Sequence, residues 1–359
     1  MSHAIVDSVE SARQEAGRLR RRYLVGMVLL GLLAAVAASF GLSFGAVGVP
    51  IGRVWSIVLD HALQRRTTAS IDNAIIWDIR APRVALGFIV GATLSVVGVA
   101  VQALVRNPIA DPYVLGIESG ASAAAVAVLY LAMSTASESV VAPTTAAFFG
   151  ALGTLLLIFL LARKRGRVSS TRLLLVGVAL SFALSGVTEF FIYLSPNPLA
   201  QEQLLFWVMG GLSGAQWNQI PIAAGILILT YAALRYQARP LNALAMGDAS
   251  ATAVGVDPDR FRIRLLVITS LAVAAVVPIA GPIGFVGLVV PHVGRMLFGA
   301  EHTRLLPAAT LIGGLYLVSV DLIGRVIFAP GEVPLGVMTA LLGTPFFLWL
   351  LRTREAGVE

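Results

Sequence analysis

The sequence predicts an all-α integral membrane protein with ten transmembrane helices. Of its 359 residues, 57% are hydrophobic and only 13% are charged, about half the charged share of a soluble domain. The mean hydropathy is +0.86. Apolar runs near the length that crosses a hydrocarbon core, about 20 residues, recur from one end of the chain to the other. No linker or shift in composition suggests a separate soluble domain.

Proline, glycine and charge clusters divide the apolar runs into ten spans. The spans lie near residues 23–42, 83–105, 113–133, 142–162, 172–194, 216–234, 265–280, 285–298, 305–324 and 335–351. The first run follows five arginines and is longer than the 7–15-residue core of a cleaved signal peptide, so we expect it to be retained. The chain thus divides into an N-terminal segment (1–22), a membrane domain (23–352) and a short tail (353–359).

The distribution of basic residues orients these spans. If both termini lie in the cytoplasm, 20 of the 26 Lys and Arg residues fall inside and 6 fall outside. This ratio fits the positive-inside rule, which places an excess of Lys and Arg in cytoplasmic loops. We therefore expect cytoplasmic N- and C-termini.

Three arginines at the outer ends of spans run against this bias: Arg80, Arg83 and Arg325. One interpretation is that they are interface anchors, with stems along apolar surface and heads in water. A second is that they form a ligand or partner site. A third applies to Arg325 alone, because Asp321 lies four residues earlier and the two can form a helical ion pair.

The residues also exclude several functions. The arginines lie between apolar runs rather than in a basic stripe, so no nucleic-acid partner is expected. The chain has no cysteine, which excludes disulfides and thiolate metal sites. A P-loop needs a lysine after its last glycine, and the only lysine is Lys164, preceded by an arginine.

A transporter without a P-loop uses an ion gradient or a separate ATPase. Ion coupling usually leaves ionisable residues within the spans, and the candidates here are Glu118, Glu189, His292 and Asp321. These four residues do not gather at one depth, as a relay at the membrane midplane would. This pattern argues against secondary transport.

Seven sequence blocks, in order, resemble the FecCD family of membrane subunits of ABC importers for iron chelates and vitamin B12. They are IRAPR (79–83), RNPIADPYVLGI (106–117), STRLLLVGVALS (170–181), FWVMGGLSGAQW (206–217), LNALAMGDASATAVGV (241–256), GPIGFVGLVVPHVGR (281–295) and VPLGVMTALLGTPFFLWLL (333–351). The resemblance implies the type II ABC importer permease fold, which also has ten spans. It also implies an inverted repeat that relates spans two to five with spans seven to ten, and the expected topology permits one.

The resemblance also implies partners. Two copies of the permease pair about a two-fold axis in the cell inner membrane, and two ATP-binding subunits dock below them and use ATP and Mg. A periplasmic binding protein delivers the cargo, and its acidic residues dock on arginines that match Arg80, Arg83 and Arg325. Arginine suits this role because its guanidinium forms a fork that matches a carboxylate and stays charged. The chain itself is expected to bind no cofactor and to catalyse no reaction.

On the cytoplasmic side the resemblance implies a gate at Asn107, Ile109, Ser170 and Thr171. The alternative for RNPIADP is simple turn chemistry, with Asp111 before Pro112 as the N-cap of the next helix. The resemblance also implies a helix that couples to the ATPase within the internal loop 239–264. The sequence predicts one helix over 241–254 there, centred on Ala245, Met246, Gly247 and Asp248. The alternative, a helix lying on the membrane surface, is disfavoured by its few basic residues.

Two further polar residues complete the expectations. His292 lies in a block that the family shares regardless of substrate, so we expect a structural, hydrogen-bonded histidine and no metal site. Glu189 either lines the pathway or satisfies a neighbouring group. The resulting hypothesis is a permease subunit that imports an iron chelate, either haem or a ferric siderophore. The alternatives are a cobalamin importer of the same family, an ion-driven secondary transporter, and a channel or scaffold.

Overall fold

The computed structural model describes residues 2–65, 70–111, 113, 116–135, 141–164, 167–168 and 170–355. These residues are helical apart from turns and one antiparallel ladder of two short strands, β1 (Arg163–Lys164) and β2 (Arg167–Val168). The helices are α1 (Ser2–Ser43), α2 (Ile51–Ala62), α3 (Ile71–Asn73), the π-helix η1 (Ala74–Arg80), α4 (Ala81–Val105), α5 (Ile117–Thr135), α6 (Val141–Ala162), α7 (Ser170–Tyr193), α8 (Pro198–Met209), α9 (Gln219–Tyr236), α10 (Ala238–Ala245), α11 (Asp248–Ala253), α12 (Pro258–Ala280), α13 (Val286–Phe298), α14 (His302–Ile327) and α15 (Leu335–Glu355).

The predicted all-helical membrane fold is confirmed. Within the described residues, seven helices are long and apolar enough to cross a membrane, and three shorter apolar helices lie at 117–133, 286–298 and 335–350. Each of these ten segments overlaps one of the ten predicted spans. The count of ten crossings and the cytoplasmic placement of the termini stay predictions, because length and composition alone define these segments.

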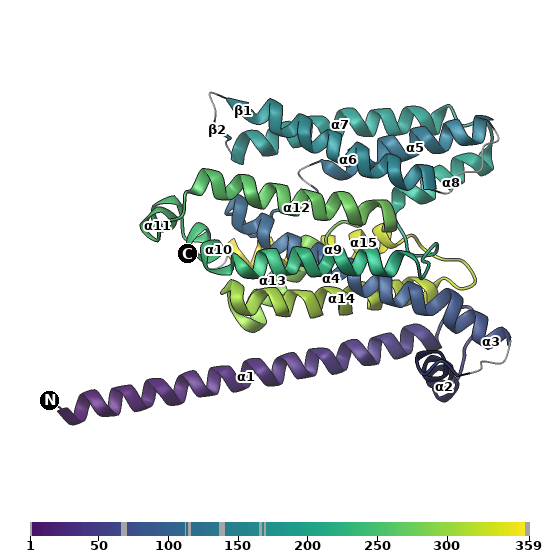
Figure 1. The fold of residues 1–359 in the computed structure, drawn as a ribbon. Coiled ribbons are helices and arrows are strands. Elements are labelled where there is room, and N and C mark those ends of the chain that lie inside the picture. The colour runs from purple at the N-terminus through teal and green to yellow at the C-terminus, as the bar shows by residue number, and fades with distance from the viewer. Residues whose placement is uncertain are drawn as a thin grey trace.

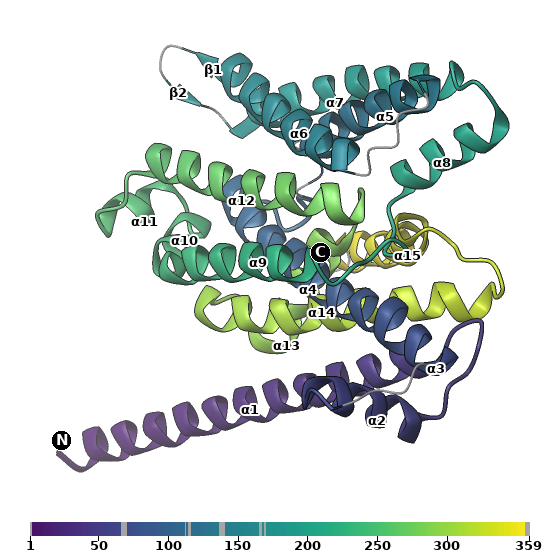
Figure 2. The ribbon, with the colours of Figure 1, turned by 45° about the vertical axis from the view of Figure 1, so that its right-hand side comes forward.

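Helix α4 lies at the centre of the bundle. It packs against α9, α12, α13 and α14. In the most apolar 18-residue stretch of residues 71–105, 83% of the residues are buried. Helices α5, α6 and α7 form a second group beside α12, and α1 lies along α14 on the opposite side (Figures 1 and 2). The long helices run roughly side by side, so the chain has two ends, one with α2 and α3 and the other with α10, α11 and the strands (Figure 1).

Glycines allow α4 to approach its neighbours closely. A Cβ added at Gly91 would overlap the carbonyl oxygen of Gly313 in α14, and one added at Gly98 would overlap that of Gly287 in α13. Close backbone contact of this kind drives helix association in lipid, where burial of apolar surface offers little gain. The small residues that the sequence places in GATLSVVGVAVQAL and GPIGFVGLVV therefore serve packing.

Helices α2 and α8 lie outside the ten spans and were not predicted. Helix α2 follows Pro50 in the outer segment, and its residue His61 packs against Trp77 of η1 with ring centroids 4.1 Å apart. Helix α8 begins at Pro198, and the side chain of Asn197 accepts a hydrogen bond from the backbone of Ala200. An Asn cap followed by Pro at the first helical position is a known start signal, so α8 could have been found from the sequence.

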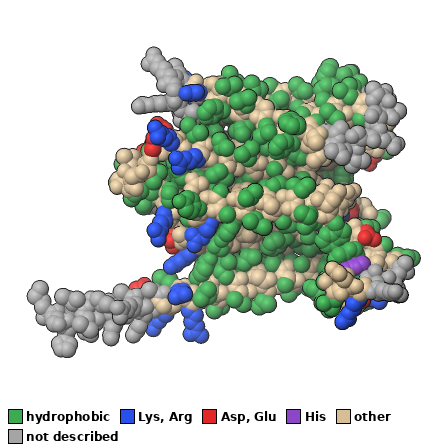
Figure 3. All heavy atoms as spheres, viewed as in Figure 1, with side chains coloured by type: hydrophobic (Ala, Val, Ile, Leu, Met, Phe, Trp, Pro, Cys, Tyr) green, Lys and Arg blue, Asp and Glu red, His purple; other side chains and the backbone are tan. Residues whose placement is uncertain are grey.

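The surface agrees with a protein set in a bilayer. Hydrophobic side chains cover most of the face seen in Figure 3, along the middle of the long helices. Lysine and arginine side chains gather toward the end that carries α10 and α11, with a smaller group near α2 (Figure 3). Charges at the two ends and apolar side chains between them are typical of a multi-pass membrane protein.

Candidate functional site

Arg83, near the start of α4, bonds two carboxylates on different edges of its guanidinium. Its Nε and Nη2 atoms donate to Oδ1 of Asp321 at 3.0 and 2.8 Å. Its Nη1 atom donates to both carboxylate oxygens of Glu332, at 3.0 and 2.8 Å. The side chain of Arg83 is only 9% exposed, so both edges of the guanidinium are occupied.

Arg325 and Arg80 lie in the same cluster. Arg325 forms an ion pair with the other oxygen of Asp321, with 3.0 Å between Nε and Oδ2, and its Nη2 donates to the carbonyl of Gly41. Arg80 donates to the next two carbonyls of α1, those of Leu42 and Ser43, each at 2.9 Å, and to the carbonyl of Val47. The carbonyls of Leu42 and Ser43 end α1, where the negative end of the helix dipole favours a cation.

The structure therefore gathers the three predicted docking arginines at one end of the bundle. The interpretation as interface anchors with heads in water is wrong, because Arg80, Arg83 and Arg325 are 5–8% exposed. The helical ion pair of Arg325 with Asp321 is confirmed. We call the five residues Arg80, Arg83, Asp321, Arg325 and Glu332 the outer cluster, because the predicted orientation places this end outside the cytoplasm. The net formal charge of the outer cluster is +1.

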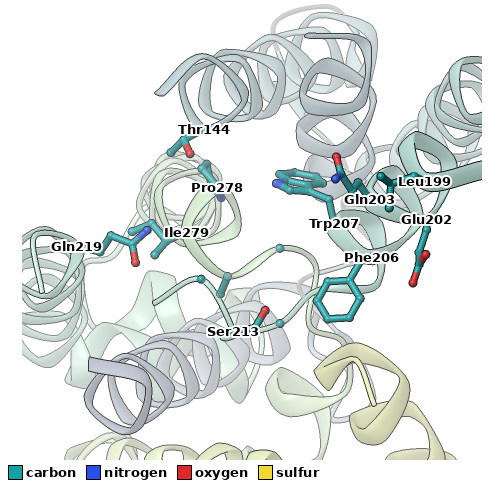
Figure 4. Close-up of a pocket in the computed structure, with 14 residues that line it drawn as sticks. Thr144, Leu199, Glu202, Gln203, Phe206, Trp207, Ser213, Gln219, Pro278 and Ile279 are labelled. Carbon is teal, nitrogen blue, oxygen red and sulfur yellow. The ribbon is translucent and has the colours of Figure 1, made fainter. Parts of the chain in front are cut away.

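A cavity of about 500 Å³ opens at the same end, between α6, α8, α9 and α12 (Figure 4). Its polar side chains include Glu202 and Gln203 of α8, and its aromatic side chains are Phe206 and Trp207 of the same helix. The backbone turn at Gly210 lies against the turn at Gly281, since a Cβ at Gly281 would come within 2.7 Å of the Gly210 Cα. Both glycines have positive φ, which few other residues adopt.

At the other end, α4 stops where Arg106 takes a left-handed conformation, with φ 54°. Asn107, a predicted gate residue, is exposed, and its side chain accepts a hydrogen bond from the backbone of Ile109 at 3.1 Å. This is the turn chemistry that was the alternative to a gate, and Ile109 is partly buried. Arg295 of α13 donates to the carbonyl of Pro108 at 3.4 Å, which fixes the loop to the bundle.

Asp111 ends this loop rather than capping α5, which begins at Ile117. Its carboxylate accepts a hydrogen bond from the backbone of Tyr113 at 2.9 Å and another from the backbone of Phe285. Burial raises the pKa of Asp111 to about 6, against these two hydrogen bonds, which lower it. The predicted role as N-cap of the next helix is wrong, because five residues separate Asp111 from the first residue of α5, Ile117.

The other predicted gate residues, Ser170 and Thr171, open α7. Their side chains lie outside the described residues. The gate at Asn107, Ile109, Ser170 and Thr171 stays a prediction.

The predicted coupling helix is two helices rather than one. Helix α10 ends at Ala245 and α11 starts at Asp248, because Gly247 has φ 120°, which breaks the helix. The sequence showed the glycine but not this conformation. Met246, between the two helices, is 73% exposed. Helix α10 is anchored by its buried residues Leu241 and Leu244.

Asp248 joins the coupling segment to two other elements. Its carboxylate forms an ion pair with Arg262 of α12 and another, at 3.3 Å, with Arg106, the first residue of the predicted gate loop. We call these three residues the inner bridge, because the predicted orientation places this end in the cytoplasm. The inner bridge places the predicted coupling and gate segments in direct contact, although they are about 140 residues apart in the sequence.

Glu189 and His292 lie in different surroundings. Glu189 of α7 is exposed and makes no hydrogen bond or ion pair with the described residues. His292 of α13 is buried, and its ring meets the edge of Phe346 at 6.0 Å. Among the described residues, no three His, Cys, Asp or Glu side chains come close enough to hold a metal ion.

The sequence did not identify three residues of these clusters. Glu332 lies in the only acidic position between α14 and α15, so its charge next to an outer span end was a signal. Arg106 and Arg262 were counted only as inside charges. Their pairing with Asp248 depends on tertiary contacts between distant segments, which no local pattern shows.

Comparison with known proteins identifies the family. The family model described as the FecCD transport family matches residues 31–353. The cobalamin import system permease protein BtuC of Halobacterium salinarum is 41% identical over 79% of this chain and 74% of its own length. The hemin transport system permease protein HmuU of Yersinia pestis is 36% identical over 94% of this chain and 98% of its own length.

Two further matches agree. The Fe(3+) dicitrate transport system permease protein FecD of Escherichia coli is 39% identical over 90% of this chain and 97% of its own length. A solved structure of a metal-chelate type ABC transporter in an inward-facing conformation superposes with a TM-score of 0.79 at 28% identity, covering 91% of this chain and 98% of the other. The predicted family and fold are therefore confirmed: this chain belongs to the FecCD transport family and is an ABC importer permease of that family.

Proposed function

We propose that this chain is the membrane subunit of an importer that moves an iron chelate, haem or a ferric siderophore, from the periplasm to the cytoplasm. Separate subunits hydrolyse the ATP, with Mg, that drives the movement. The observation that carries the proposal is the position of two arginine–carboxylate clusters at opposite ends of one transmembrane bundle. One cluster suits a delivery protein outside, and the other lies in the segment that meets an ATPase inside.

The outer cluster supports docking of an acidic partner. It has a net positive charge and it is held rigidly by α1, α4 and α14. Guanidinium groups held in fixed positions match the two oxygens of a carboxylate, so they can fix the orientation of a partner that carries carboxylates.

Reversal of the charge at Arg83 tests this docking. The variant Arg83→Glu should lose binding of the periplasmic binding protein while basal ATPase activity of the assembled importer persists. Binding can be measured with the permease and its ATPase in nanodiscs. An unchanged Kd for Arg83→Glu would refute the docking role.

The exposed face of α7 supports pairing with a second copy. Only 17% of the residues in its most apolar 18-residue stretch are buried in the single chain. Glu189 lies on this helix with its side chain exposed. A carboxylate facing lipid is costly, so such residues usually face a bundle interior or a water-filled cavity. We infer that α7 lines a pathway between two copies in the inner membrane.

The inner loops support coupling to an ATPase. Met246 is exposed between α10 and α11, and Asp248 links this segment to the predicted gate loop through Arg106. A displacement of this segment would therefore reach the gate through a short chain of contacts.

The identity of the cargo is the most specific part of the proposal. Relatives named for hemin and for Fe(3+) dicitrate support an iron chelate. Cobalamin is the second candidate, favoured by the 41% identity to the cobalamin import permease of Halobacterium salinarum. A screen of the cognate binding protein against haem, ferric siderophores and cobalamin distinguishes them. Tight binding of cobalamin alone would overturn the iron-chelate proposal.

Reconstitution tests the class of transporter. Proteoliposomes that contain this chain, its ATPase and its binding protein should accumulate cargo only when ATP is supplied. Accumulation driven by a proton or sodium gradient, without nucleotide, would instead indicate a secondary transporter.

A further inference from the structure

Two carboxylates share Arg83, and they differ in how firmly they are held. Asp321 lies within α14 with its side chain 5% exposed, and it bonds both Arg83 and Arg325. Glu332 lies in the loop between α14 and α15, and its side chain is 37% exposed. Within the described residues its only partner is Arg83. Asp321 is therefore fixed by the fold, whereas the carboxylate of Glu332 can leave Arg83 and be hydrated by water instead.

Glu332 also covers the one edge of Arg83 that a partner could reach. The Nε–Nη2 edge faces the buried Asp321, and the Nη1 atom faces the two oxygens of Glu332. Arg83 itself is 9% exposed. A carboxylate that arrives from outside can bond Nη1 only after Glu332 has moved away.

The charge of the outer cluster favours replacement of Glu332 by another carboxylate over loss of Glu332 without a replacement. If Glu332 leaves, the three arginines keep Asp321 as their only carboxylate, and the local charge rises from +1 to +2. Cations that are largely removed from water need a paired anion. An incoming carboxylate restores that pairing with the same two-oxygen geometry.

We propose that Glu332 is a built-in competitor that occupies Arg83 in the free permease and is displaced by a carboxylate of the binding protein. The inference rests on the proposed docking role of the outer cluster and adds a residue that sets its affinity. Docking exchanges one carboxylate for another at Arg83, so the bond gained is nearly offset by the bond lost. The complex can then form specifically and still dissociate after delivery.

The test is the binding of the cargo-free cognate binding protein to the permease–ATPase complex in nanodiscs, with association and dissociation rates measured separately. The variant Glu332→Gln keeps the size of the side chain and removes its charge. Loss of a competing, partly exposed ion pair should lower the Kd by about three- to tenfold. The association rate should rise, because no carboxylate of the permease has to leave Nη1 of Arg83 before the binding protein can bond it.

A matched control separates competition from long-range attraction. Asp78 of η1 is an exposed acid at the same end and makes no ion pair with the described residues. Asp78→Asn removes the same charge and should leave the Kd within about twofold, because Asp78 does not pair with Arg83 and an exposed charge is screened by salt. An equal gain in both variants would overturn the proposal.

The remaining outcomes also decide between the two proposals. An unchanged or higher Kd for Glu332→Gln, together with lost binding for Arg83→Glu, refutes the competitor and leaves docking at Arg83 standing. Unchanged binding for Arg83→Glu refutes docking itself. Basal ATPase activity and gel-filtration profiles that match the wild type show that each variant is folded.

Discussion

The two ends of the molecule use the same motif in opposite settings. At the outer end Asp321 bridges Arg83 and Arg325, and at the inner end Asp248 bridges Arg106 and Arg262. The side chain of Asp321 is 5% exposed, whereas that of Asp248 is 48% exposed. The motif is the same, but only one of the two carboxylates is removed from water.

Burial decides what each bridge can do. A buried carboxylate between two arginines cannot leave without exposing uncompensated charge, so Asp321 holds α4 and α14 in one arrangement. An exposed ion pair contributes little and can break and re-form. The outer end therefore suits a rigid surface on which a partner docks, and the inner end suits segments that move against each other.

Removal of the buried carboxylate should have the largest effect. The variant Asp321→Asn leaves Arg83 and Arg325 buried without their shared anion, which should destabilise the protein by about 3–5 kcal/mol. Thermal unfolding in detergent measures the loss. The control Asp60→Asn breaks an exposed ion pair at the same end, with Arg65 at 3.8 Å, and should change stability by less than about 1 kcal/mol.

A triple variant sharpens the same point. Arg83→Met, Asp321→Leu and Arg325→Met together remove every charge of the bridge and replace it with apolar side chains of similar length. Most of the stability lost in Asp321→Asn should return, because the cost comes from unpaired buried charge. A triple variant as unstable as Asp321→Asn would show that Asp321 stabilises the fold in some other way.

The sequence predicts much of the fold but less of either bridge. Ten apolar runs overlap the ten apolar helical segments, because the bilayer imposes a length that periodicity and hydropathy report directly. The ion pair of Asp321 with Arg325 follows from a four-residue spacing on one helix. Its extension to Arg83 does not, since Arg83 lies 238 residues away in the sequence.

The coupling segment shows where local reasoning fails. The residues from Leu241 to Val254 favour a helix, yet the chain breaks at Gly247 with φ 120°. A glycine permits this conformation without requiring it. The break is set by contacts of its neighbours, the buried leucines of α10 and the pairing of Asp248 with Arg106 and Arg262. Those contacts exist only in the folded bundle.

Loss of the half-exposed Asp248 carboxylate should affect coupling more than stability, because the buried Arg262 keeps its ion pair with Asp259. Asp248→Asn should change the unfolding free energy by about 1 kcal/mol or less. It should lower transport per ATP by about fivefold, the lower end of typical coupling between sites. Uptake and ATPase activity are measured together in proteoliposomes.

The control for this variant is Asp259→Asn. Asp259 also pairs with Arg262, at 3.5 Å, but it makes no ion pair with Arg106. Transport per ATP should therefore stay at the wild-type value. An equal loss in both variants would show that Arg262, rather than the link to the gate loop, is responsible.

The smallest effect should come from pH at the inner end, through Asp111. Its pKa is raised to about 6 by burial, above the value of about 3.9 in an unfolded chain. Between these two values the folded state binds more protons than the unfolded state, so stability falls as pH rises from about 4 to 6. Above pH 6 the loop holds a partly buried carboxylate whose hydrogen-bond donors, among the described residues, are backbone groups of Tyr113 and Phe285.

The variant Asp111→Asn keeps an oxygen that accepts the hydrogen bond from Tyr113 and cannot ionise. It should flatten the pH dependence of thermal unfolding between about pH 4 and 6, and it should be the more stable protein at pH 7. Asp257→Asn is the control, because Asp257 accepts backbone hydrogen bonds from Asp259 and Arg260 in the same way but is exposed. If Asp111→Asn keeps the wild-type slope, burial of Asp111 does not set the pH response. That result would mean that the charge of Asp111 costs the inner end no more stability than the charge of Asp248, which is in contact with water.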